Sequence, residues 1–456
     1  MSHSRFRGLT LALAGILCLS GCATYHALPL TSAEVERKLR PLGDDALAIA
    51  ARKIKHPLLH SLRLDASDGL SPDEAELLAV LLNPALRALR DQAGEARAQL
   101  LKAGILPNPQ WTGNLDFVTG GTTEGTRTGF GHGLSWDLQA LVTRGQDVAS
   151  ARNDDQAVRL DIAWDEWQTA LAARSAVYDL VSLRAQVAQA QEISERLASN
   201  VGLVRKAAAA HEMTVLESAT VEASANDARS VLLGLEQELE QRRIALNRAI
   251  GYPSATKLRL QSATALPSRV DPPSAASLLH GLEERRLDLL ALKRGYESQD
   301  AKLRSAILAQ FPNISVGFNR ATDTGNVRTL GPTITLALPL FDHNQGNIAL
   351  ANATRQRLFD EYTSRLFTAR ADVAAALADI QALNDQIAHA DQALPALRRL
   401  VEISGNAVAE GNAGILGYYT TQNDLNRKSL DVLKLKQQLA QARIALEIAA
   451  AWHLSP

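Results

Sequence analysis

The feature that most constrains this chain is an internal duplication, in which residues of the first half recur in the second half at one fixed distance. An offset of 205 positions relates three well-spaced pairs: Pro107 and Pro312, Asn114 and Asn319, and Asp137 and Asp342. This period is too long for a solenoid, whose repeats run to about 20–50 residues. The chain is therefore expected to contain two similar structural halves.

Each half has the pattern of a helix, two strands, a very long helix, a turn and a returning helix. Helices are expected over 72–105, 140–206 and 214–249 in the first half, and over 275–310, 345–408 and 415–453 in the second. Apolar residues in the long helices recur at three- and four-residue spacing, which predicts coiled-coil-like packing. The two stripes are Trp164, Trp167, Leu171, Tyr178 and Val181, and Ile380, Leu383, Ile387, Ala390 and Leu394. A helix of about 65 residues reaches roughly 100 Å, which no compact domain needs.

Two segments in each half alternate between apolar residues and polar residues or glycine. They are the predicted strands, over 111–118 and 126–138 in the first half and over 314–318 and 330–338 in the second. Alternation over about 9–11 residues is what a membrane-spanning barrel strand requires, although a soluble two-layer core would also use it. The pattern favours an α+β fold in which long helices join a β-barrel.

Aromatic side chains are scarce in the chain but gather at these strands and their ends. The expected membrane-interface residues are Trp111, Phe117, Phe130, Trp136, Phe318 and Phe341. In an up-down hairpin, Trp111 and Trp136 should lie at one height and Phe117 and Phe130 near the opposite rim. Rings at two levels are typical of the aromatic girdles of membrane barrels.

Four strands per chain cannot close a barrel, because even the smallest membrane barrels have about eight. An open strand edge leaves backbone groups unpaired in lipid, which is not tolerated. Several chains must then share one barrel. Three chains would supply twelve strands, and a dimer would satisfy the same arithmetic.

The first residues predict export and lipid attachment. A short basic start precedes an apolar run over 9–19, which is too short for a bilayer span of about 20 residues but suits a signal peptide. The run ends in Leu-Ser-Gly-Cys at 19–22, the pattern of a bacterial lipobox, so Cys22 is the expected lipidation site. The alternative is an ordinary signal peptide with an incidental cysteine.

A group of prolines marks the boundary between the two halves. Four of them interrupt the helical pattern between 251 and 274, where a linker is expected. The predicted organisation has five parts: a lipoprotein signal peptide over 1–21, a lipid-anchored segment over 22–70, a first repeat over 71–253, a linker over 254–274 and a second repeat over 275–456.

One longer motif is specific enough to suggest a family. Residues 338–346 read Leu-Pro-Leu-Phe-Asp-His-Asn-Gln-Gly and follow the last predicted strand, while Phe-Pro-Asn at 311–313 precedes the third. The sequence resembles the TolC-like outer-membrane efflux family over nearly the whole mature chain. The resemblance implies a homotrimer with one shared barrel in the outer membrane and a helical tunnel across the periplasm. It also implies two partners, a periplasmic adaptor protein and an inner-membrane transporter.

The resemblance further implies the exit duct of a tripartite efflux pump, lipid-anchored in the outer membrane and carrying metal cations or drugs. Within the family, the motif at 338–346 is most similar to exporters of heavy-metal cations. Two other functions remain open. One is the outer-membrane duct of a type I protein secretion system, and the other is a non-conducting structural lipoprotein that bridges the envelope layers.

The working parts implied by the resemblance are the helix turns at the tip of the tunnel. The expected adaptor contacts are Val204, Arg205, Thr214, Gly411, Gly414 and Ile415. Thr214 and Glu217 have the spacing of a capping box for the returning helix, and Gly411 is expected to stop the second long helix. The first turn has alanine over 207–210, where relatives usually carry glycine.

Glu402 is the expected gate residue. It stands about two turns before Gly411, roughly where relatives place acidic residues that narrow the closed tip. One carboxylate from each chain would form a ring that favours cations; a solvated surface glutamate is the alternative. Pro395 is expected to kink the same helix.

No other chemical site is expected. His56 and His60 have the spacing of two ligands on one helix face, but no acidic or cysteine partner completes a metal site. The sequence contains no recognisable catalytic arrangement or cofactor motif, so an enzyme is not expected. The formal net charge of −1 gives no indication of a nucleic-acid partner.

Overall fold

The computed structural model describes residues 23–59, 64–65, 68–122 and 124–454, and it divides into two compact units at the boundary between Leu42 and Gly43. The first unit contains α2 (Ser32–Leu39), whose N-cap Thr31 accepts a hydrogen bond from the backbone of Glu34 at 3.3 Å. The predicted signal peptide and the expected lipidation site Cys22 lie outside the described residues.

The second unit contains two similar successions of helices and strands, preceded by α3 (Asp44–Ala51). The first comprises α4 (Pro72–Leu82), α5 (Pro84–Gly104), β1 (Gln110–Asp116), β2 (Gly129–Asp137), α6 (Gln139–Ala209) and α7 (Val215–Ile250). The second comprises α8 (Ala275–Leu279), α9 (Leu282–Arg285), α10 (Leu287–Leu308), β3 (Asn313–Thr322), β4 (Arg328–Ala337), α11 (Gln345–Ala409) and α12 (Ile415–Ala450). The predicted α+β fold with long helices and a small sheet is confirmed.

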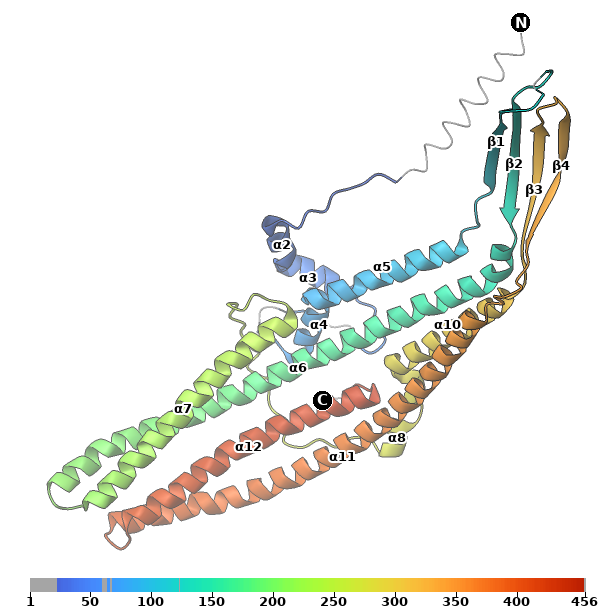
Figure 1. The fold of residues 1–456 in the computed structure, drawn as a ribbon. Helices are drawn as coiled ribbons and strands as arrows, with labels where there is room; N and C mark the ends of the chain where they lie inside the picture. The colour runs from blue at the N-terminus through green and yellow to red at the C-terminus, as the bar shows by residue number, and fades with distance from the viewer. Residues whose placement is uncertain (1–22, 60–63, 66–67, 123, 455–456) are drawn as a thin grey trace. The chain divides into compact units, whose positions relative to one another are not determined.

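The four strands form one antiparallel sheet in the order β1-β2-β3-β4. Each repeat supplies one hairpin, and the pairing of β2 with β3 joins the two hairpins. In that pairing Leu134 lies opposite Phe318 and Trp136 opposite Val316. Backbone hydrogen bonds therefore link the repeats, and β1 and β4 are the outer strands (Figure 1).

The long helices have close to their predicted lengths. α6 has 71 residues and α11 has 65, so each spans roughly 100 Å at a rise of about 1.5 Å per residue. Each turns back into a helix of 36 residues, α7 or α12. Within the second unit, Figure 1 shows the two turns at the opposite end from the sheet. No helix in the described part of the chain combines the length and the apolar content needed to cross a membrane.

Two predicted helices are wrong as single elements. The segment 72–105 breaks at Asn83 (φ −58°, ψ 120°), because Pro84 disfavours a helical conformation in the residue before it and donates no N–H. The Asn83 side chain then caps α5. The segment 275–310 divides into α8, α9 and α10, with Gly281 at φ 65° between the first two.

Each repeat has an apolar core where its long helix meets its returning helix. The first includes Ala173, Val177, Leu180, Leu246 and Ile250. The second includes Val373, Ala376, Ile380, Ile387, Leu439 and Leu446. Seven residues of the two predicted apolar stripes are buried: Trp164, Trp167 and Leu171 on α6, and Ile380, Ile387, Ala390 and Leu394 on α11. The two apolar cores stabilise the helical hairpins, whereas Trp164, Trp167 and Leu171 of α6 pack with Leu287 of α10 and Ile444 of α12 and so join the two repeats.

Candidate functional site

The first tip turn, between α6 and α7, is built around His211. Its backbone N–H donates to the carbonyl of Ala208 at 3.1 Å. The N–H of Glu212 donates to the carbonyl of Ala207 at 2.9 Å. These two bonds form a Schellman motif, which requires a left-handed residue after the helix. His211 supplies it with φ 61°, although glycine is the usual residue there.

The second tip turn, between α11 and α12, has the same backbone. The N–H of Gly411 donates to Val408 at 3.0 Å. The N–H of Asn412 donates to Ala407 at 2.8 Å, and Gly411 has φ 73°. The chain therefore contains the same turn twice, with histidine at the left-handed position in one copy and glycine in the other.

The helices that leave the two turns begin differently. The Thr214 hydroxyl accepts from the backbone N–H of Glu217 at 3.2 Å, and the Glu217 carboxylate accepts from the N–H of Thr214 at 2.9 Å. This geometry confirms the predicted capping box. α12 begins at Ile415 after Gly414, which has no side chain that could accept.

A small apolar cluster joins the two helical hairpins near the turns. Tyr419 of α12 is 4 % exposed and belongs to a cluster with Leu197 and Val204 of α6 and Val221 of α7, and Ile415 packs against it. Val204 is itself only 6 % exposed. The helix–helix interface therefore covers the side chain of Val204 in the single chain, and its contact with an adaptor stays a prediction.

The other tip residues are accessible. Arg205 pairs with the carboxylate of Glu222 at 2.7 Å, which connects α6 to α7. Large apolar side chains are exposed close to both turns: Leu203, Val215 and Leu216 in the first repeat, and Ile403 and Leu416 in the second. Grouped apolar side chains on a surface are typical of a protein–protein contact.

Glu402 lies on an exposed position of α11. Pro395 lies inside the same helix, which continues to Ala409. A single chain thus presents one carboxylate here, and a ring of carboxylates would require further copies. The gating role of Glu402 stays a prediction.

One face of the sheet presents large apolar side chains. The register places Trp111, Leu134 and Phe318 in one row across β1, β2 and β3. A shallow groove lies on this face, with seven apolar lining residues: Pro109, Leu134, Trp136, Val316, Phe318, Pro332 and Ile334. Because Trp111 is 71 % and Phe318 65 % exposed in the single chain, this face has no protein cover.

The predicted common height of Trp111 and Trp136 is wrong by two positions. Trp111 pairs with Leu134, so Trp136 lies nearer the helical end, where its Nε1–H donates to the carbonyl of Pro107 at 2.7 Å. Phe130 lies opposite Leu115, next to the end of β1 at Asp116, so Phe117 and Phe130 both lie near the opposite rim as predicted. Among the remaining aromatics, Phe117 follows β1 and is 67 % exposed, and Phe341 follows β4 and is 91 % exposed.

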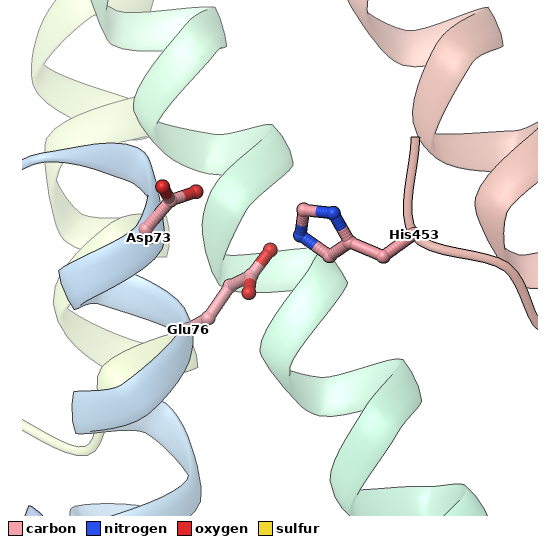
Figure 2. Close-up of side chains that lie close together, drawn as sticks. All are labelled: Asp73, Glu76 and His453. Carbon is pink, nitrogen blue, oxygen red and sulfur yellow. The ribbon is translucent and has the colours of Figure 1, made fainter. Parts of the chain in front are cut away.

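A cluster of charged side chains lies where α4, α6 and α12 meet the C-terminal residues. The members of this Arg174 cluster are Asp73, Glu76, Arg174, Arg443, Glu447 and His453. Asp73, Glu76 and His453 each offer a possible metal ligand, and the three ligand atoms lie within 4.8 Å of one another (Figure 2).

Arg174 already supplies a cation to this cluster. Its guanidinium pairs with Asp73, with Glu76 at 3.0 Å and with Glu447 at 2.9 Å. A metal ion would have to share these carboxylates with a guanidinium group that is 4 % exposed. The three possible ligands therefore do not make a metal site on geometry alone.

Burial changes the acidity of the cluster. It raises the pKa of Glu76 to about 8, against the opposing effect of the Arg174 guanidinium. Burial also raises the pKa of Glu447. Removing a carboxylate from water disfavours its charged form, and the neighbouring carboxylates add to this effect at Glu76.

The hydrogen bonds of His56 indicate a structural role for its side chain. Its Nδ1 accepts from the backbone N–H groups of Leu58 and Leu59, each at 3.1 Å. This arrangement leaves the proton on Nε2, which lies 2.8 Å from the carbonyl of Ala163. Both nitrogens are thus engaged, and burial lowers the pKa of His56. His60, its suggested partner, lies outside the described residues.

Sequence reasoning missed the Arg174 cluster, although one signal was present. Arg174 falls between Leu171 and Tyr178 on the apolar stripe of α6, at the same three- and four-residue spacing. A charged residue on a buried stripe requires a buried partner. The partners Glu76 and Glu447 could not be found in the same way, because they lie about 100 and 270 positions away in sequence.

Comparison with known proteins identifies a family that the chain resembles. Residues 278–451, from α8 to the end of α12, match the family described as "Outer membrane efflux protein". A curated relative, the pyoverdine export outer membrane protein OpmQ of Pseudomonas aeruginosa, is 26 % identical over 385 residues, which are 82 % of this chain and 79 % of the relative. The second repeat of the chain thus resembles the outer membrane efflux protein family. The location of the chain is accordingly the outer membrane.

Two further proteins resemble this chain. The cation efflux system protein CusC of Escherichia coli is 23 % identical over 406 residues, covering 82 % of this chain and 85 % of the relative. The solved structure of the outer-membrane channel OprN superposes with a TM-score of 0.73 at 15 % identity, covering 95 % of this chain and 99 % of that one. The structural likeness shows that this chain shares the fold of OprN.

Proposed function

We propose that this chain is the exit duct of a tripartite efflux pump. In this role it conducts substrates passively from an inner-membrane transporter and a periplasmic adaptor to the exterior. One observation carries the proposal: a single chain combines a sheet with an uncovered apolar face and two helical hairpins of roughly 100 Å. Such a chain can extend from a membrane across an aqueous layer.

The sheet supports a shared barrel. Its outer strands β1 and β4 would leave unpaired backbone groups in lipid, which the bilayer does not tolerate. Pairing β4 of one copy with β1 of the next removes both edges. We infer a homotrimer, in which three copies supply twelve strands in a closed barrel of common size.

The two tip turns are the proposed contacts with the adaptor protein. They lie at the end of the helices remote from the sheet (Figure 1) and carry the exposed side chains of Leu203, Val215 and Leu216. Arg205, Thr214, Gly411, Gly414 and Ile415 form or flank these turns. Val204 would contribute by holding the hairpins together and not by direct contact.

The substrate class is proposed as metal cations or drugs. One relative is named for pyoverdine export and another for cation efflux, and a carboxylate ring of Glu402 would favour cations. A strain that lacks the gene should become sensitive to its substrates, so growth with heavy-metal salts and with a drug panel distinguishes the two classes. Unchanged growth with loss of a secreted protein would instead indicate a protein secretion duct.

Attachment to outer-membrane lipid through Cys22 belongs to the same proposal. Metabolic labelling with a palmitate analogue should modify the wild-type chain and leave Cys22→Ser unlabelled. Equal labelling of the variant would show that the lipid is carried elsewhere.

The first test is the native mass and planar-bilayer conductance of the detergent-extracted mature protein. A conducting trimer is expected, and polyvalent cations should reduce its conductance. Glu402→Gln should weaken that block, whereas Glu410→Gln, with its exposed carboxylate outside the proposed ring, should retain it. A monomer without conductance would overturn the duct, and a non-conducting trimer would favour the structural lipoprotein.

A further inference from the structure

The basic side chains of the sheet lie on its apolar face. The strands β1–β4 contain three basic residues: His132, Arg320 and Arg328. Arg320 is two residues from Phe318 on β3, so the two side chains point to the same side of the sheet. His132 is the partner of Arg320 on β2 and therefore lies on this side. Arg328 is two residues from Leu330, the partner of Arg320 on β4, and lies there too.

The acidic side chains of the sheet lie on the opposite face. Asp116 is five residues from Trp111 on β1, and an odd spacing along a strand reverses the side. Asp137 is likewise one residue from Trp136 on β2. The rest of that face carries only glycine, alanine and uncharged polar residues. Hydration alone would favour this polar face for the arginines as well, because water stabilises charged groups. Their position on the apolar face requires another explanation.

The two arginines occupy one end of the apolar face. Arg328 begins β4 and Arg320 is two residues before the end of β3, so both lie close to the hairpin turn at 323–327. The row of apolar side chains that includes Phe318 lies nearer to the helices. Leu330 stays opposite Arg320, so this end mixes apolar and basic side chains. Arginine on the lipid face of a barrel is costly at the bilayer midplane but costs little near the interface.

No acidic side chain of the described residues pairs with either arginine. Both side chains are exposed, and neither forms an ion pair or a hydrogen bond within the described part of the chain. The acid of the adjacent turn, Asp323, instead accepts from the backbone N–H groups of Gly325 at 2.9 Å and Val327 at 2.8 Å. Diagonal neighbours on paired strands, such as the two arginines, are about 7–8 Å apart. Two unpaired like charges at this spacing repel, and an anion between them would remove the repulsion.

We propose that Arg320 and Arg328 bind a phosphate group of a lipid in the outer leaflet of the outer membrane, with His132 at the edge of the site. The proposal rests on the duct proposed above, because it requires the apolar face to meet lipid and the helices to lie on the periplasmic side. The hairpin turns then lie at the outer surface. The two arginines accordingly lie at the level of the outer headgroups.

The surroundings of the site favour a lipid phosphate over a free phosphate ion. A guanidinium group offers two parallel N–H donors that match two phosphate oxygens. Long arginine side chains can lie along an apolar surface while their charged ends reach the headgroups. Phe318, two residues from Arg320, lines the uncovered apolar groove together with Pro332. The acyl chains of a bound lipid would pack on this groove, whereas a free ion would make no contact with it.

Native mass spectrometry of the detergent-extracted mature protein tests the site with two probes. They are lipid A and the same lipid after enzymatic removal of its phosphate groups. One arginine near an anionic surface contributes about fivefold in affinity, so two should give the wild type a preference of roughly twenty-five-fold for the phosphorylated lipid. Arg320→Gln and Arg328→Gln should each reduce this preference about fivefold, and the double variant should abolish it.

Two control variants separate the site from the net charge of the chain. Arg229→Gln removes an exposed arginine of α7, outside the sheet, and should keep the wild-type preference. Thr329→Arg, added to Arg328→Gln, returns the charge one residue along β4 but on the polar face. This double variant should not regain the preference. Recovery to the wild-type value would overturn the site, because net charge would then explain the binding.

The native mass and conductance of the same wild-type sample separate this inference from the duct, and they need no variant. A conducting trimer that binds both forms of the lipid equally would overturn the phosphate site and leave the duct intact. Displacement of lipid A by an equal concentration of inorganic phosphate would indicate a site for a free anion and overturn the lipid assignment. A monomer without conductance would overturn the duct and, with it, the lipid-facing position of the strands.

Discussion

The two tip turns have one backbone but different residues at its most demanding position. Gly411 adopts the left-handed conformation without steric cost, whereas His211 adopts it with a side chain. Five residues separate the helices in both repeats, over 210–214 and 410–414. The difference indicates that the length of the connection and its hydrogen bonds specify this turn. Glycine only lowers the conformational free energy of the left-handed residue. The costlier first turn is also the one followed by a side-chain cap, at Thr214.

The largest expected effect comes from replacing Gly411, which adopts the left-handed conformation of the second turn without steric cost. Gly411→Val places a β-branched side chain at φ 73° and should destabilise the turn by about 2 kcal/mol. Hydrogen exchange at the Asn412 amide should then increase about thirtyfold. Gly417→Val is the matched control, because Gly417 is helical and has open space around it. Equal exchange in both variants would show that the left-handed conformation is not what glycine provides.

Removing the cap of the first turn should have a smaller effect. Thr214→Ala deletes the hydroxyl that accepts from Glu217 and should cost about 1 kcal/mol. The measurement is exchange at the Glu217 amide. Thr220→Ala is the control, since its hydroxyl donates to the Leu216 carbonyl inside α7 and caps nothing. If both variants exchange alike, the capping box does not offset the strain at His211.

Exchanging the residues at the left-handed positions, His211 and Gly411, tests the comparison between the two turns further. His211→Gly should stabilise the first turn by about 0.5–1 kcal/mol, because relief of the left-handed strain exceeds the entropy that glycine adds to the unfolded chain. Gly411→His should cost the second turn a similar amount. Protection of the Glu212 and Asn412 amides reports each change. A loss of protection in His211→Gly would mean that the imidazole makes a stabilising contact.

The smallest effect is expected from giving the second turn a cap. Gly414 already has extended angles (φ −77°, ψ 139°) suited to an N-cap. Gly414→Ser should therefore add a few tenths of a kcal/mol by accepting a backbone N–H in the first turn of α12. Slower exchange at the Gly417 amide would show it, and faster exchange would indicate that the serine disturbs the turn.

Local patterns predicted much of the fold. Alternation located all four strands, and three- and four-residue spacing located the long helices, since both patterns follow from which side of an element is buried. The offset of 205 at the strands does not persist to the tips, where His211 and Gly411 are 200 apart. The two long helices begin 206 positions apart and end 200 apart, so α11 is six residues shorter than α6.

The break at Asn83 is an error that could have been avoided, because the next residue is a proline. The other errors arose where the structure depends on distant residues. The height of Trp136, for example, depends on a strand register that pairs Trp111 with Leu134. A shift by two residues keeps every side chain on its own face, so alternation could not detect it. The burial of Val204 could not be predicted either, because Tyr419, about 215 positions later, covers it. Capping at Thr214 was predicted correctly because it depends on residues three apart.

Pairing of β2 with β3 has a consequence for assembly. In a ring of three such chains, three of the six contacts between hairpins are already made within single chains, and three form between chains. Six separate half-chains would need five association steps to form the ring, whereas three duplicated chains need two. Each association costs an estimated 4–15 kcal/mol of translational and rotational freedom. Duplication within one polypeptide would thus spare such a ring three association steps and fix the alternation of unlike tips around its axis.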